Sequence, residues 1–199
     1  TGPCDYDAVD IEQRQRSAML AILPKVVGNL YNTRWYNTTA QVGSVLGDEV
    51  DNSEKVVGDK DGEFIKLAVD NGTEYVKSLS FKGAPLNLRK LVQFAQQMPR
   101  LNTFKCYDCN AGGQPLPPKL HVAAPGMLRL VLENSGLAGS LPESWGNWPS
   151  LEELDLSSNS ITGTLPEGFA ALGNLTRLAL RSNRLQGTLP TSWGQAKVM

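Results

Sequence analysis

The chain has 199 residues, of which 41% are hydrophobic and 20% are charged, and its formal net charge is -1. This composition is that of a globular protein with a sizeable core. A near-neutral charge without a dense run of Lys or Arg argues against nucleic-acid binding, so we expect no nucleic-acid partner. The longest apolar stretch, residues 18–30, contains Pro24 and Lys25 and is too short to span a bilayer. We therefore expect no membrane insertion within this chain.

Residues 1–74 predict an N-terminal cap that precedes the main body of the chain. Apolar residues within 8–30 recur at helix-like intervals around Pro24 and predict helical segments. Residues 37–62 are rich in Gly, Asp, Asn and Ser, which predicts an irregular loop. The runs FIKLAV and EYVKSLSF follow, separated by a turn with Asn71 and Gly72. They predict a β-hairpin that leads into the rest of the chain.

Residues 75–199 contain a repeat of about 24 residues, with copies that start near 76, 101, 127, 151 and 175. Aligned from Leu151 and Leu175, two consecutive copies are identical at nine of 24 positions. Each copy begins with a version of LxxLxLxxN. Its residues at positions one, four and six face inward from a short strand and are buried only when successive coils stack. The sequence therefore predicts an α/β solenoid with a parallel β-sheet.

Two further positions of the repeat predict the bends of each coil. Asn159 and Asn183 stand at position nine, where an inward amide satisfies backbone groups that the turn leaves unpaired. Gly139, Gly163 and Gly187 precede a Leu-Pro pair, where Gly permits a bend that is strained for other residues. We interpret all five as structural residues of the solenoid.

The three cysteines, Cys4, Cys106 and Cys109, are too few for a disulfide scaffold, and the sequence leaves their pairing open. Cys106 and Cys109 form a CxxC inside a repeat, where packing explains them better than redox chemistry. A zinc site would need two further ligands, and His121 is the only histidine. Phosphate-binding and hydrolase motifs are missing from the sequence as well. We therefore predict no metal, no cofactor and no enzymatic activity.

The pattern LxxLxLxxNxLxGxLPxx(F/W)xxLxx resembles the leucine-rich repeat, in particular the 24-residue plant-type class of receptor-kinase ectodomains and polygalacturonase inhibitors. The segments GSLPESW and GTLPTSW are also similar to repeats of protist and kinetoplastid surface antigens. The resemblance implies an extracellular or cell-surface module that recognises a partner through the concave face of its sheet. An inhibitor-type or cytoplasmic scaffold protein is one alternative, and a structural component of a surface or matrix is another.

The variable strand positions three, five and seven predict which residues would face a partner. Adjacent parallel strands place equivalent positions about 4.8 Å apart, so these side chains form columns. The candidates for contact with a protein or glycan ligand are Tyr107, Arg129, Glu153, Asp155, Arg177 and Arg181. Tyr and Arg are favoured anchors at interfaces. The alternative is a solvated face whose charges pair with one another.

Two further features concern the location and the end of the solenoid. Asn37, Asn71 and Asn174 begin NxS/T triplets, which are glycosylation acceptors in a secreted protein, although the hairpin turn also explains Asn71. Met199 falls at position one of a further coil, where a buried Leu is expected. Because terminal repeats need a polar cap, we expect the C-terminal end to continue into further repeats or to pack on another chain.

Overall fold

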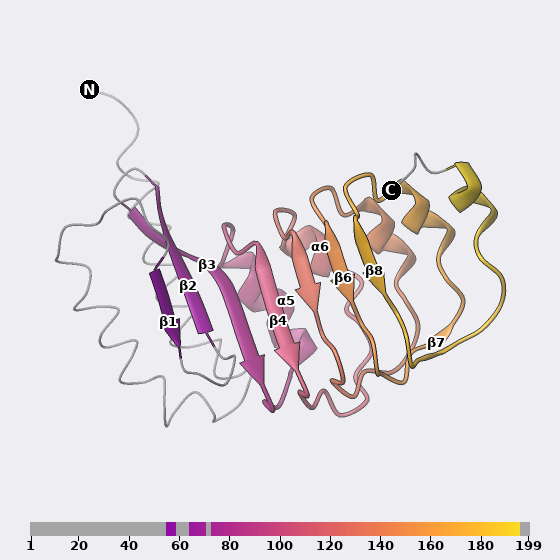
Figure 1. The fold of residues 1–199 in the computed structure, drawn as a ribbon, viewed down its shortest axis with the longest axis horizontal. Coiled ribbons are helices and arrows are strands. Elements are labelled where there is room, and N and C mark those ends of the chain that lie inside the picture. The colour runs from indigo at the N-terminus through magenta and orange to yellow at the C-terminus, as the bar shows by residue number, and fades with distance from the viewer. Residues whose placement is uncertain (1–54, 59–63, 71–72, 196–199) are drawn as a thin grey trace.

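The computed structural model describes residues 55–58, 64–70 and 73–195 of the chain, which form a solenoid of stacked coils (Figure 1). Strands line one side of the solenoid, and short helices line the other. The predicted α/β solenoid with a parallel sheet is therefore confirmed. The predicted helices within residues 8–30 and the coil that would begin at Met199 lie outside the described residues.

The sheet begins with three antiparallel strands, β1 (Lys55–Gly58), β2 (Phe64–Asp70) and β3 (Thr73–Lys82). Asp70 pairs with Thr73, so a two-residue connection joins β2 to β3 and the predicted hairpin is confirmed. The prediction of an irregular loop over residues 37–62 is wrong at Lys55–Gly58, which form β1. Its two β-branched valines favour a strand, and the surrounding Gly and Asp residues masked that signal in the sequence.

Four strands continue the sheet parallel to β3 in the order β4, β5, β6, β8. They are β4 (Thr103–Tyr107), β5 (Arg129–Val131), β6 (Glu153–Asp155) and β8 (Arg177–Ala179). The inward residue at repeat position four pairs in register along the whole series: Leu79, Phe104, Leu130, Leu154 and Leu178. The register of the strands thus follows the spacing of the repeat.

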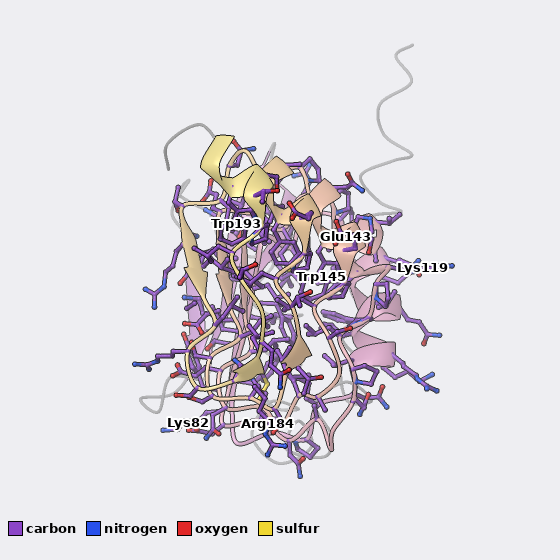
Figure 2. All side chains as sticks on the ribbon, turned by 90° about the vertical axis from the view of Figure 1, so that its right-hand side faces the viewer. Lys82, Lys119, Glu143, Trp145, Arg184 and Trp193 are labelled. Carbon is purple, nitrogen blue, oxygen red and sulfur yellow. A yellow bond between two sulfur atoms is a disulfide. The ribbon has the colours of Figure 1, made fainter. Side chains whose placement is uncertain are left out.

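The core lies between the sheet and a row of helices on the other side of each coil, and side chains fill it in the view along the solenoid (Figure 2). The helices are α5 (Leu88–Gln96), α6 (Leu120–Ala123) and the 3₁₀ helices η2 (Glu143–Asn147), η3 (Glu167–Ala171) and η4 (Thr191–Gln195). Trp145 and Phe169 are buried in this core, and Trp193 is partly buried against it. No helix within the described ranges has the length and apolarity to cross a bilayer.

Glutamates at one repeat position cap the 3₁₀ helix of the following coil. Glu143 Oε1 accepts a hydrogen bond from the Gly168 N–H at 2.6 Å, at the start of η3. Glu167 accepts from the Thr191 and Ser192 N–H groups at 3.3 Å and also contacts the Ser192 hydroxyl. The Ser192 hydroxyl is the main reason that the pKa of Glu167 is lowered. Consecutive coils are therefore joined by side-chain caps as well as by the sheet.

The Asn at repeat position nine bonds to backbone groups of its own coil and of the preceding one. Asn159 Nδ2 lies 2.8 Å from the Leu132 carbonyl and 2.9 Å from the Leu156 carbonyl, and Oδ1 accepts from the Ser135 and Leu137 N–H groups at 3.0 Å. Asn183 repeats the arrangement one coil further on.

The glycines before each Leu-Pro pair adopt positive φ. Gly139, Gly163 and Gly187 have φ of 80°, 83° and 88°, in the region that residues with a Cβ rarely adopt. Beside them, β7 (Thr162–Gly163) and β9 (Arg184–Leu185) form a second, two-stranded sheet. The bend at these glycines turns each coil from this small sheet toward its 3₁₀ helix.

Candidate binding face

The concave face is the surface of the main sheet that points away from the helices. Repeat position three forms one column across it, in register: Ser78, Thr103, Arg129, Glu153 and Arg177. Position five forms the next: Ser80, Lys105, Val131, Asp155 and Ala179. All the side chains of each column therefore share one face of the sheet.

Repeat position seven forms a third column just beyond the ends of the short strands. Lys82 pairs with Tyr107 in register. Backbone hydrogen bonds carry the alignment further, from Asp108 N to the Glu133 carbonyl, from Asn134 N to the Ser157 carbonyl and from Ser158 N to the Arg181 carbonyl. The column therefore runs through Lys82, Tyr107, Glu133, Ser157 and Arg181.

Most of the predicted contact residues are joined in one ion-pair network. Glu153 lies between two arginines, 3.8 Å from Arg129 Nε and 3.5 Å from Arg177 Nε. Arg177 Nη2 also lies 3.5 Å from Asp155 Oδ2, and Arg129 Nη2 lies 3.7 Å from Glu152 Oε2. The charges at position three thus pair with one another. Apart from the pair with Asp155, whose side chain is only 8% exposed, these pairs are solvent-accessible and contribute only about 0.2 to 1 kcal/mol each, so a partner can exchange them at little cost.

Arg181 forms a separate pair that reaches across an intervening coil. Its Nη2 atom lies 3.1 Å from Glu133 Oε1, although the two residues are 48 positions apart in the chain. The side chain of Arg181 is 77% exposed, whereas that of Glu133 is 29% exposed. The arginine is therefore the more hydrated partner of this pair.

Tyr107 is a half-buried aromatic side chain among carboxylates. Burial raises the pKa of its phenol, and the charges of Glu153, Glu133 and Asp155 raise it further, while Arg177 lowers it. The phenol is therefore protonated at neutral pH, and its hydroxyl is a hydrogen-bond donor.

Ser157 is a residue of this face that sequence reasoning did not select. The residue is 1% exposed, and its hydroxyl has no hydrogen-bond partner among the residues that the structure describes. The Ser157 N–H donates to Asp155 Oδ1 at 2.9 Å. Glu133 was not selected either. Both belong to the position-seven column, but the sequence contains no signal for a buried hydroxyl without a partner.

The predicted glycosylation acceptors stay predictions. Asn174 is exposed, and its Nδ2 donates to the Pro149 carbonyl at 2.7 Å. Asn37 and Asn71 lie outside the described residues.

Cys106 and Cys109 form a disulfide at the end of β4, with a Cα–Cα distance of 5.8 Å. This bond settles the pairing that the sequence left open for these two residues, whereas Cys4 lies outside the described residues. Cys109 occupies repeat position nine, which belongs to Asn159 two coils later. The disulfide therefore closes the turn where a later coil uses an inward amide.

Residues 125–185 match the leucine-rich repeat family. No curated protein sequence matches the chain. Three of the solved structures that are similar to it illustrate the fold. One is the BIR3–SERK2 complex from Arabidopsis thaliana, with 22% identity, a TM-score of 0.53 and coverage of 60% of this chain and 63% of that chain. Another is the ectodomain of the Arabidopsis plant membrane receptor kinase GASSHO1/SCHENGEN3 in complex with CASPARIAN STRIP INTEGRITY FACTOR 2, with 24% identity, a TM-score of 0.53 and coverage of 65% and 15%.

The third structure is a plant ice-binding protein, with 16% identity, a TM-score of 0.56 and coverage of 92% of this chain and 60% of that chain. The chain spans less than two thirds of each of these three proteins. At these identities the likeness establishes the fold. Residues 125–185 thus consist of leucine-rich repeats, and the described part of the chain has the fold of a leucine-rich repeat solenoid.

Proposed function

We propose that this protein is an extracellular or cell-surface recognition module that binds a protein partner through its concave face. The observation that carries the proposal is the set of three aligned columns on that face. They combine a half-buried Tyr107 with arginines held in weak, exchangeable ion pairs. Tyr and Arg are among the residues that most often anchor protein interfaces. The role is binding without catalysis, and it involves no metal or cofactor.

The disulfide supports the extracellular part of the proposal. The Cys106–Cys109 bond is almost fully buried inside a coil. Disulfides persist in secreted and surface proteins and are rare in the cytosol, where thiols are kept reduced. This observation favours a surface module over a cytoplasmic scaffold. The GASSHO1/SCHENGEN3 ectodomain, which has a similar fold, is a receptor in complex with another molecule, so the proposal fits a use that this fold already has.

The partner is expected to cross-link to the concave face and not to the helical side. We propose to place the photo-cross-linker p-benzoylphenylalanine at Lys105, in the middle of β4, and at Val122, which is 68% exposed on α6. The full chain is then irradiated on the surface of its native cells, and adducts are identified by mass spectrometry. One protein should be captured from position 105 and missing from position 122.

Equal capture from both positions, or capture from position 122 alone, would contradict the proposal. The same material reports on location, because glycans at Asn37, Asn71 or Asn174 occur only on protein that has entered the secretory route. A chain whose Cys106 and Cys109 are both reduced when it is isolated under alkylating conditions would argue for the cytoplasmic alternative.

A further inference from the structure

We infer that the concave face takes a cationic side chain, above all an arginine of a basic protein segment, between Tyr107, Glu133 and Ser157. This cation site rests on the proposed recognition function and specifies the chemistry of the partner. In the free protein the place is held by Arg181, which acts as an internal stand-in for the partner's cation.

The first support is the path of the Glu133–Arg181 ion pair. The Asn134 N–H donates to the Ser157 carbonyl, and the Ser158 N–H donates to the Arg181 carbonyl. Ser157 therefore lies between Glu133 and Arg181 in the position-seven column. A 3.1 Å contact between Glu133 and Arg181 therefore has to pass over the coil that carries Ser157. This contact shows that Glu133 accepts a guanidinium group that reaches it from outside its own strand.

The second support is the hydroxyl of Ser157, which is buried and has no partner within the described part of the chain. A buried hydroxyl that makes no hydrogen bond costs free energy, so a ligand that supplies the missing hydrogen bond binds with higher affinity. A guanidinium group carries five N–H donors. The guanidinium of Arg181 bonds to Glu133 without bonding to Ser157. An arginine that is not tethered to the last strand is free to bond to both.

The sign of the ligand's charge depends on which member of the Glu133–Arg181 pair is hydrated at lower cost when the pair separates. Arg181 is 77% exposed, so its release leaves a fully hydrated guanidinium on the rim and costs little. An anionic ligand would instead displace Glu133, which is 29% exposed and shares its surroundings with Glu153 and Asp155 around Tyr107. That release would leave a carboxylate among like charges. A cation is therefore the favoured ligand.

Tyr107 favours arginine over other cations. Carboxylates gather around its phenol, and the face of an aromatic ring attracts a cation. A planar guanidinium stacks on such a ring and still directs N–H groups to a carboxylate, whereas an ammonium group is a compact, strongly hydrated charge. We therefore expect arginine to bind more tightly than lysine at this position.

The test is an NMR titration of the full chain with N-acetyl-arginine amide as the probe. We expect saturable changes in the amide resonances of Glu133 and Ser157. The Arg181→Ala variant should bind the probe about two- to fivefold more tightly, because the internal competitor is gone. Glu133→Gln should weaken binding of the probe about tenfold. Arg184→Ala removes an exposed arginine of β9, which belongs to the second sheet and not to the main one, and should change nothing.

Three outcomes would overturn the cation site. In the first, the amide resonances of Arg181→Ala show no saturable change at about 100 mM N-acetyl-arginine amide. In the second, this variant binds the probe more weakly than the wild type does. In the third, N-acetyl-glutamate amide causes resonance changes as large as those that the arginine probe causes. The two proposals fail separately. A partner adduct from position 105 without an arginine response would contradict the cation site alone. An arginine response without any adduct would contradict the recognition function and leave the cation site intact.

Discussion

Asn159→Ala is expected to lower the free energy of unfolding by about 3 to 4 kcal/mol. The side-chain amide of Asn159 contacts the carbonyls of Leu132, Leu156 and Ser157 and accepts from the Ser135 and Leu137 N–H groups. The residue is buried, so water replaces these bonds poorly. An alanine would leave several backbone groups of two neighbouring coils without a partner, and each such group costs about 1 to 3 kcal/mol before the structure relaxes.

The measurement is urea unfolding of the wild type and the variant, followed by circular dichroism. Asn174→Ala is the matched control, because Asn174 is exposed and its side chain donates one hydrogen bond, to the Pro149 carbonyl. The control should lose less than about 1 kcal/mol. If the two alanine variants unfolded at the same urea concentration with the same slope, the Asn at position nine would not have the structural role assigned to it.

Gly146→Ala is expected to destabilise the solenoid by about 3 kcal/mol or more, because consecutive 3₁₀ helices approach each other through their backbones. A Cβ atom at Gly146 would lie 2.2 Å from the Gly168 carbonyl oxygen and 2.9 Å from the Gly168 Cα. These are backbone atoms, so no side-chain rotation relieves the overlap and η2 has to move away from η3. Outside such a contact, alanine is favoured over glycine by about 0.4 to 1 kcal/mol, so the expected loss runs against the intrinsic preference.

Gly173→Ala is the matched control for this substitution. A Cβ atom at Gly173 would meet nothing within 4 Å, and its φ lies outside the left-handed region. Thermal unfolding should therefore show a variant as stable as the wild type, or slightly more stable. A Gly146→Ala protein that melts with the Gly173→Ala protein would show that η2 and η3 are not in the close contact described here.

The sequence predicted the solenoid and the register of its parallel strands because the inward leucines repeat at a constant spacing. Leu130, Leu154 and Leu178 pair in register where the repeat placed them. Outside the repeat, prediction was poorer. The strand β1 escaped notice because its four residues lie in a Gly- and Asp-rich segment, and antiparallel pairing with β2 is a tertiary effect. The Cys106–Cys109 bond depends on the geometry of the turn after β4, which the spacing of two cysteines does not specify.

The columns of the binding face followed from the period of the strands, but only some of their contacts did. Sequence places Arg129, Glu153 and Arg177 in one column, and their mutual pairing follows from adjacency. The reach of Arg181 to Glu133 depends on a long side chain that crosses a small residue, and only the packed structure reveals it. That the Ser157 hydroxyl is buried without a partner is likewise visible only in the packed structure.

The most direct test of the account is the affinity of the cross-linked partner for two point variants of the full chain. Tyr107→Ala removes the aromatic anchor of the concave face, and Val122→Ala trims an exposed apolar side chain on the helical side. Binding measured by titration calorimetry should weaken about tenfold or more for Tyr107→Ala, equivalent to about 1.4 kcal/mol, and should be unchanged for Val122→Ala. Unchanged binding by Tyr107→Ala together with weaker binding by Val122→Ala would contradict the account.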